Sequence, residues 1–458
     1  MKTLNNLALS FITACVICVF TFLVTFSTAT FFFSLFILIL GNIFAYLIFE
    51  KSSKFSAIKL YNIVFCFYVL LAINHFLGYQ VDWSLFRQDL LDEYKFYSLT
   101  DTNQYKSISE NFKDSYISRD YLEYAGYVFY ISSLASIANS LSDGNHLLLQ
   151  LLGTTSFGIL TSVLIFKILN IYIEPKKSFK YTMFFMFFSV FNFYSFQLLR
   201  DIPIAFFYTG GIYIVLSQSL RNKYLKLVLM ILLTVLIWQL RFEHGLFFSL
   251  FVLVYCFKVF KKNKKILVLI VMCSLVVLTS LFFNHVSKLT SRMDMYSEFT
   301  QNSVDSKEDS FAKYIYKLPP VAKEIGVIVN SQIQPFPSWL LLESSTNTYK
   351  FIEGLFQILY AFFWFIIFFS LCKWILFEKR ILVFKNEILV LSILCLIFLI
   401  ANTANMTLRR IIVFYPFIFL VYVWIKEFSI NRKQFKITTF YGCYIYGFLI
   451  LIYLFLKI

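Results

Sequence analysis

Apolar runs of about twenty residues recur from one end of this chain to the other, and they constrain the fold more than any other feature. Each run is long enough to cross a hydrocarbon core roughly 30 Å thick as a helix. Hydrophobic residues make up 59% of the 458 residues and charged residues only 14%, whereas soluble domains are roughly a quarter charged. No stretch between the runs has the composition of a soluble domain. The sequence therefore predicts one all-α polytopic membrane domain over residues 1–458.

Thirteen crossings are expected, at residues 8–26, 31–49, 57–78, 147–173, 181–199, 202–219, 224–240, 245–260, 266–284, 351–377, 387–404, 411–426 and 437–456. Their orientation follows from the basic residues between them, because Lys and Arg are enriched in cytoplasmic loops. Basic loops occur at 51–54, 176–180, 221–226, 261–265, 379–380 and 432–436. All of them fall on one side of the predicted topology, which we assign to the cytoplasm.

The weakly apolar stretch 121–141 does not fit this alternation, because a crossing there would move every later basic loop to the outside. Parity favours an amphipathic helix on the outer surface, with its Tyr and Phe rings at headgroup level. The open alternative is that an earlier helix pair does not span.

The topology leaves two long outer loops, 79–146 and 285–350. They hold 17 of the 25 acidic residues, and the first has ten acidic against five basic residues. The first outer loop is therefore acidic, whereas the cytoplasmic loops are basic.

Charged residues also interrupt the apolar pattern at three turns, all on the predicted outer face. Ionisable groups at membrane depth cost several kcal/mol and mark functional sites. Any single turn needs polar residues in any case, but the positive-inside bias disfavours arginine on this face. The residues concerned are Arg200, Asp201, Arg241, Glu243, His244, Arg409 and Arg410.

Arginine at such turns suits a phosphate, a pyrophosphate or an anionic lipid head, because its planar fork of donors grips phosphate and keeps its charge. Neighbouring carboxylates would supply a general base or bind a sugar. Glycosyl transfer needs this pair of functions, a stabilised phosphate leaving group and an activated hydroxyl. The candidate bases are Asp82, Asp89, Asp92, Glu93 and Asp101 of the first outer loop, and His244.

Several other chemistries find no support in the sequence. It contains no Walker A loop, GxGxxG, HExxH or GxSxG motif. The eight cysteines lie inside apolar runs, and no ligand spacing calls for a metal, so no cofactor is predicted. The formal charge of +16 is scattered over short loops, which favours topology over nucleic-acid binding.

Five segments together resemble a known family: YLEYAGYVFYISSLASI, LLRDIPIAFFYTGGIYIVL, LRFEHGLFFSLFVL, PFPSW and TLRRIIVFYPFIFL. They resemble the bacterial O-antigen and capsule repeat-unit polymerases (Wzy type) and the related GT-C glycosyltransferases. The likeness extends from residue 80 to 425. It implies a GT-C-like helical fold with two long periplasmic loops in the bacterial inner membrane. The active site would face the periplasm and act on undecaprenyl-linked oligosaccharides, without nucleotide or obligatory metal.

The resemblance also implies roles for individual residues. In polymerases, arginines hold the lipid pyrophosphate, and Arg200, Arg241 and Arg409 or Arg410 match, with Asp201 and Glu243 beside them. In GT-C enzymes an acid of the first outer loop is the base, and here Asp92, Glu93 or Asp101 would match. The partners implied for a polymerase are its lipid-linked substrate, membrane lipids and a possible chain-length regulator protein.

Three functions remain open at this stage. A polymerase is the first, and a GT-C enzyme that moves a single sugar from a polyprenyl-phosphate donor is the second. The early acidic loop favours the second, because typical polymerases have their large periplasmic loop late in the chain. A polysaccharide flippase or other transporter is the third, and it should place charges along a central cavity.

Overall fold

The structure is a computed structural model that describes residues 2–80, 125–141, 147–260, 318–319, 322–323, 348–378 and 412–457. Throughout these ranges the regular elements are helices. They are α1 (Lys2–Thr25), α2 (Thr28–Ile48), α3 (Lys54–Gln80), α6 (Ala125–Ser140), α7 (Leu147–Asn170), α8 (Pro175–Phe188), α9 (Val190–Ser195), α10 (Asp201–Leu216), α11 (Lys223–Leu240), α12 (Phe242–Phe260), α17 (Thr348–Cys372), the π-helical turn η2 (Lys373–Phe377), α19 (Tyr415–Ser429) and α20 (Arg432–Lys457).

The predicted all-helical membrane class is confirmed at a coarse level. Six helical segments are long and apolar enough to cross a membrane, namely α1, α2, α3, α7, α11 and the segment Leu359–Phe377. Two further apolar helices are shorter, Asp201–Leu216 and Phe242–Phe257. The expected crossings 266–284 and 387–404 lie outside the described residues, so thirteen crossings stay a prediction.

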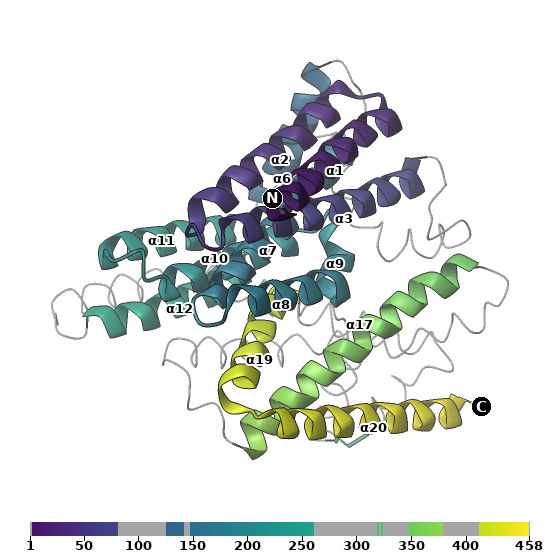
Figure 1. Ribbon diagram of the computed structural model, residues 1–458, viewed down its shortest axis with the longest axis vertical. Coiled ribbons are helices and arrows are strands. Elements are labelled where there is room, and N and C mark those ends of the chain that lie inside the picture. The colour runs from purple at the N-terminus through teal and green to yellow at the C-terminus, as the bar shows by residue number, and fades with distance from the viewer. Residues whose placement is uncertain are drawn as a thin grey trace.

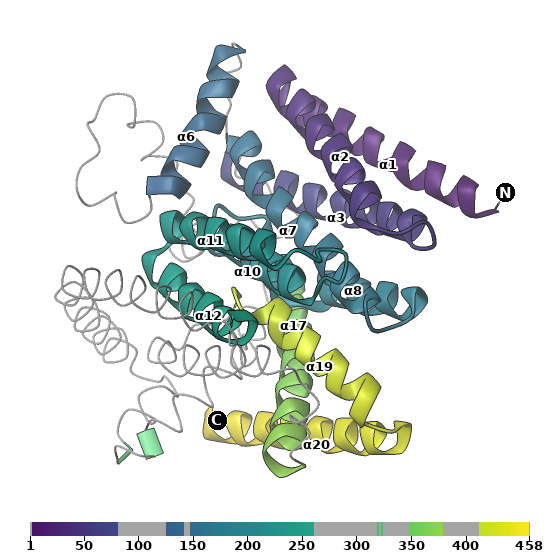
Figure 2. The ribbon, with the colours of Figure 1, turned by 90° about the vertical axis from the view of Figure 1, so that its left-hand side faces the viewer.

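Helix α7 is the centre of the fold. The apolar window of α7 is 83% buried, against 17% for those of α1 and α11. It packs against α3 on one side and α10 on the other, while α1 and α2 cover α3 (Figure 1). The C-terminal helices α17, α19 and α20 lie at the far end of the molecule from α1 and α2 in both views (Figure 2).

The polar residues of α7 account for its central position. Thr161 and Ser162 are buried and donate hydrogen bonds to the carbonyls of their own helix, which lets small polar side chains pack between helices. Thr154 makes a 3.1 Å hydrogen bond with the hydroxyl of Tyr127, and the Gln150 amide donates to the Ile131 carbonyl. The last two bonds hold α6 against α7.

Helix α6 forms within the stretch expected to be a surface helix, 121–141, of which residues 121–124 lie outside the described ranges. One of its faces is buried against α7, with Tyr127 and Ile131 at its centre. The opposite face exposes Phe129 and Ile137. Ser136, Asn139 and Ser140 are exposed as well, so the exposed side of the helix is mixed, and its depth in a membrane stays a prediction.

One expected crossing, 181–199, is not a continuous helix. Helix α8 ends at Phe188, Ser189 is extended with φ −121° and ψ 153°, and α9 then runs for only six residues. The side-chain amide of Asn192 donates to the Phe187 carbonyl (3.1 Å) and to the Tyr360 hydroxyl of α17 (2.8 Å). Periodicity could not reveal this break, because the residues on both sides of it are apolar.

The other expected crossings within the described ranges coincide with helices to within a few residues, and their ends meet as the predicted alternation requires. At the predicted cytoplasmic end, Lys177 of α8 lies 3.0 Å from Glu427 of α19. At the predicted outer end, Arg241 lies 3.1 Å from Asp201. Helix ends that the basic loops assign to one side are thus neighbours.

Cysteine labelling tests this orientation. We expect Ser140→Cys, at the exposed end of α6, to react with a membrane-impermeant maleimide on intact cells. Ser52→Cys, exposed between α2 and α3, should react only after the membrane is permeabilised. The unsubstituted protein, whose described cysteines lie in helices, gives the background. Labelling of Ser52→Cys on intact cells would show that the topology is the reverse of the predicted one.

Candidate functional site

A cluster of charged side chains joins three helix ends. Asp201 is the first residue of α10, Arg241 separates α11 from α12, and Glu243 lies in the first turn of α12. An Arg241 guanidinium nitrogen lies 3.1 Å from Asp201 Oδ1, and Arg241 Nε lies 3.5 Å from Glu243 Oε2. Residues 40 positions apart in the sequence therefore form one site.

The chain geometry at Arg241 explains how the cluster forms. Its backbone is extended, with φ −164° and ψ 118°, so α11 ends there and α12 starts in a new direction. The Arg241 amide still donates to the Ile237 carbonyl, and its own carbonyl accepts from the amide of Gly245. The bend aims the guanidinium sideways at α10 rather than along α11.

Burial makes these charges costly and their pairing necessary. The Asp201 and Arg241 side chains are 5% and 12% exposed, and that of Glu243 is 23% exposed. Removing one partner of such a pair leaves an uncompensated buried charge. Asp201 gains further stabilisation from the N-terminus of α10, where the helix dipole favours negative charge. Arg241 thus fixes both carboxylates in place.

His244 lies next to this cluster and is 1% exposed. Its carbonyl accepts a 2.8 Å hydrogen bond from the Tyr208 hydroxyl of α10. Its ring packs between aromatic neighbours, with centroids 6.1 Å from Tyr208 and 5.8 Å from Phe414. Since Phe414 directly precedes α19, a fourth helix end belongs to the site.

The length of α10 sets the depth of the site. Its 16 residues give a helix of about 24 Å, shorter than a hydrocarbon core of roughly 30 Å. Most of α10 is buried among its neighbours. If its other end lies level with the basic loop 221–226, Asp201 lies below the outer membrane surface and is surrounded by protein.

The site residues predicted from the sequence divide into two groups. The structure brings Asp201, Arg241, Glu243 and His244 together, with the partly buried Arg200 directly before α10. The expected residues Asp92, Glu93, Asp101, Arg409 and Arg410 lie outside the described residues. In the part of the chain that the structure describes, no three His, Cys, Asp or Glu side chains are grouped as metal ligands would be.

The geometry changes the role expected for Arg241. The sequence suggested that it holds a pyrophosphate, yet its guanidinium already lies against two carboxylates. An arginine in these contacts orients the two carboxylates, and anion binding by Arg200 stays a prediction from the sequence. The pairing could have been anticipated, because the start of α10 and the end of α11 are the same end of an antiparallel helix pair.

No family model matches the chain, and no curated protein or solved structure matches it either.

A mutant cycle tests the burial of the ion pair. We expect Arg241→Met to lower the free energy of unfolding by about 3 kcal/mol, because it strands the Asp201 carboxylate. The double variant Asp201→Leu with Arg241→Met should be less destabilised than the single one. Denaturant titration of the purified variants in detergent measures both free energies of unfolding.

The matched control is Lys177→Met, which breaks an ion pair whose lysine is 56% exposed. Exposed pairs contribute little, so its loss should be the smallest of the three. Equal losses of unfolding free energy for Lys177→Met and Arg241→Met would show that the Arg241–Asp201 pair is not desolvated.

Proposed function

We propose that the protein is a membrane glycosyltransferase that polymerises undecaprenyl-pyrophosphate-linked oligosaccharide repeat units. It would act at the periplasmic face of the bacterial inner membrane, in O-antigen or capsule biosynthesis. The observation that supports this proposal is the largely buried cluster of Asp201, Arg241 and Glu243 at the ends of helices in a membrane chain. Ionisable groups buried within a membrane domain serve a function more often than they serve stability.

The reaction needs a leaving group that departs with negative charge. A hydroxyl of the acceptor sugar attacks the anomeric carbon of the donor chain, and the bond from that carbon to the pyrophosphate oxygen breaks. The lipid pyrophosphate leaves with the electron pair, and the hydroxyl proton passes to a base. Cationic groups aimed at the pyrophosphate stabilise the charge that develops in the transition state.

Arginines around the cluster supply that positive charge in our proposal. Arg200 directly precedes Asp201, and the sequence places Arg409 and Arg410 shortly before Phe414, whose ring packs against that of His244. Arg241 is a single positive charge against the two carboxylates of Asp201 and Glu243, so the proposal assigns binding of an anion to the remaining arginines. Arg241 then acts by positioning the two carboxylates.

The proton acceptor is proposed to be His244 or a carboxylate of the first outer loop, with Asp92, Glu93 and Asp101 as candidates. Imidazole titrates near neutrality, which suits a general base. The ring of His244 is packed between those of Tyr208 and Phe414, so the loop carboxylates remain the alternative. Because the bilayer delivers both substrates in two dimensions, positioning should supply much of the rate.

A GT-C glycosyltransferase that moves a single sugar is the second candidate. It is favoured by the early loop 79–146, with ten acidic residues against five basic ones. A flippase is disfavoured, because it should carry charges along a central cavity. The buried ionic cluster that the structure describes lies instead at helix ends.

Gel analysis of the surface polysaccharide after deletion of the gene separates these functions. We expect the ladder of chain lengths to collapse to a single repeat unit on the lipid core, because repeat units can no longer be joined. An intact ladder with altered mobility, or with one sugar missing, would instead indicate the single-sugar transferase. Loss of all repeat units from the periplasmic face would point to a flippase.

Complementation of the deletion strain tests the site itself. Arg200→Ala should reduce chain extension about 100-fold, the scale for losing one group that stabilises a transition state. Arg241→Ala should also reduce it, because Asp201 and Glu243 lose the group that positions them. Lys54→Gln, at the predicted cytoplasmic end, is the control and should restore the full ladder. Membrane levels of each variant are compared by immunoblot, and full activity of Arg200→Ala at normal levels would contradict the proposal.

A further inference from the structure

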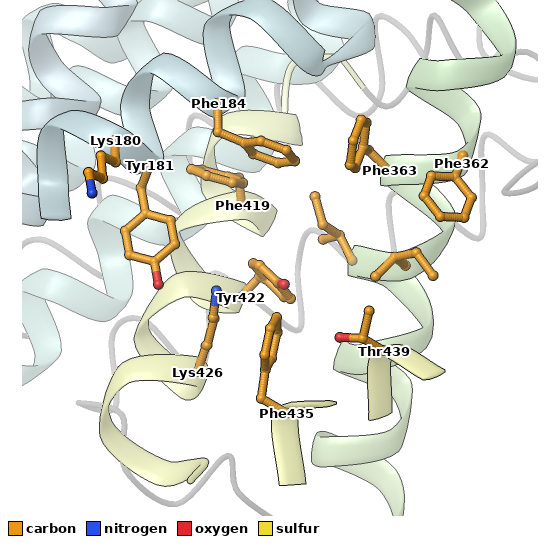
Figure 3. A pocket seen from close by; sticks show the side chains of 12 residues that line it. Lys180, Tyr181, Phe184, Phe362, Phe363, Phe419, Tyr422, Lys426, Phe435 and Thr439 are labelled. Carbon is orange, nitrogen blue, oxygen red and sulfur yellow. The ribbon is translucent and has the colours of Figure 1, made fainter. Parts of the chain in front are cut away.

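A cavity of about 370 Å³ lies between α8, α17, α19 and α20, and none of the residues of the ionic cluster line it (Figure 3). This volume falls within the range of roughly 300–1,000 Å³ typical of small-molecule sites. Helix α19 relates the two places, because it starts beside His244 and ends at the cavity. The cavity therefore belongs to the end of the molecule that is predicted to face the cytoplasm.

Most of the cavity wall is apolar and aromatic. Ile366 and Ile367 of α17 are buried, at 7% and 4% exposed, and form its inner side. The remaining apolar lining is contributed by Phe184, Phe362, Phe363, Phe419 and Phe435, together with the rings of Tyr181 and Tyr422. A wall of this kind suits a hydrocarbon chain and offers few hydrogen bonds to a polar molecule.

Two lysines complete the lining, and no carboxylate is among the described residues that line it. Figure 3 shows Lys180, Tyr181 and Lys426 on one side of the cavity and Phe362 and Phe363 on the other. The Lys426 ammonium lies over two rings, 4.9 Å from the centroid of Tyr181 and 4.1 Å from that of Phe435. Cation–π contacts hold its charge at the cavity edge.

The carboxylate of Glu427, next to the lining residue Lys426, already has hydrogen-bond partners. Glu427 accepts hydrogen bonds from Lys177 Nζ at 3.0 Å and from the Tyr181 hydroxyl. Burial alone would raise the pKa of Glu427, but these two hydrogen bonds outweigh it and lower the pKa below its usual range. Glu427 is therefore ionised, but it is one carboxylate against three lysines, Lys177, Lys180 and Lys426, so net positive charge remains at this edge of the cavity.

The polar side of the cavity offers one more group. The hydroxyl oxygen of Thr439 lines the cavity and is buried, and among the described residues it has no hydrogen-bond partner. A buried hydroxyl of this kind costs free energy unless a ligand or water satisfies it. It suits an ester or headgroup oxygen that lies between the lysines and the apolar wall.

We propose that this cavity binds an anionic phospholipid of the cytoplasmic leaflet, with one acyl chain between α17 and α19 and the phosphate at Lys180 and Lys426. Both lysines lie at helix ends on the basic face, the level at which anionic headgroups are found. The site is separate from the proposed catalytic cluster, so either assignment can fail without the other.

Native mass spectrometry of the purified full-length protein tests the proposal. The protein is delipidated in detergent and titrated with phosphatidylglycerol or with phosphatidylcholine of the same acyl chains. We expect one phosphatidylglycerol to be retained above the statistical distribution, and phosphatidylcholine to bind more weakly. Removal of both charges in Lys180→Gln with Lys426→Gln should weaken phosphatidylglycerol about 30-fold, since each lysine near a surface contributes about 1 kcal/mol.

Two further variants separate the headgroup from the chain. Lys54→Gln removes a lysine that also lies over an aromatic ring, 3.8 Å from the centroid of Tyr46, on the same predicted face but outside the cavity, and should change nothing. Thr439→Leu narrows the cavity and should weaken both lipids. Equal retention of the two lipids by the wild type would overturn the proposal, as would undiminished phosphatidylglycerol binding by the double lysine variant. The double lysine variant and Lys54→Gln change side chains that are at least partly exposed. Elution of each as one symmetric peak in size-exclusion chromatography verifies that it folds.

Discussion

The ion pair between Arg241 and Asp201 is costly to bury, and it persists only because three helices meet at their ends around it. Arg241 terminates α11, Asp201 starts α10 and Glu243 starts α12. If any one of these ends were displaced, a charge would be left in apolar surroundings. The pair therefore fixes the register of the three helices relative to one another. His244 and Tyr208 extend the same arrangement to the start of α19.

The two ends of the molecule differ in their charge chemistry. At the predicted outer end, the single charge of Arg241 lies against the two carboxylates of Asp201 and Glu243 and fixes their geometry. At the opposite end, Lys180 and Lys426 line a cavity without a carboxylate among its described lining. The first arrangement favours orientation of reacting groups, and the second favours attraction of an anion. Helix α19 reaches from one environment to the other.

Most helices could be predicted from the sequence because a membrane requires long apolar runs, and the positions of α2, α3 and α11 follow directly from that requirement. The partners of Asp201 could be narrowed to the neighbouring turn by topology alone. Two features could not be predicted. The break at Ser189 lies within an apolar run, and the paired state of Arg241 depends on a backbone bend that no residue type announces. Hydropathy reports the length of an element, but not the direction in which its last side chain points.

The break between α8 and α9 has a mechanical consequence. One side-chain amide, that of Asn192, both closes the break through the Phe187 carbonyl and grips the Tyr360 hydroxyl of α17. The amide has two hydrogens, so the bonds coexist without competition. A sliding motion of α17 along the bundle would pull on Asn192 and loosen the joint at Ser189. Displacement of α17 along the bundle must therefore either break the hydrogen bond between Asn192 and Tyr360 or change the angle between α8 and α9.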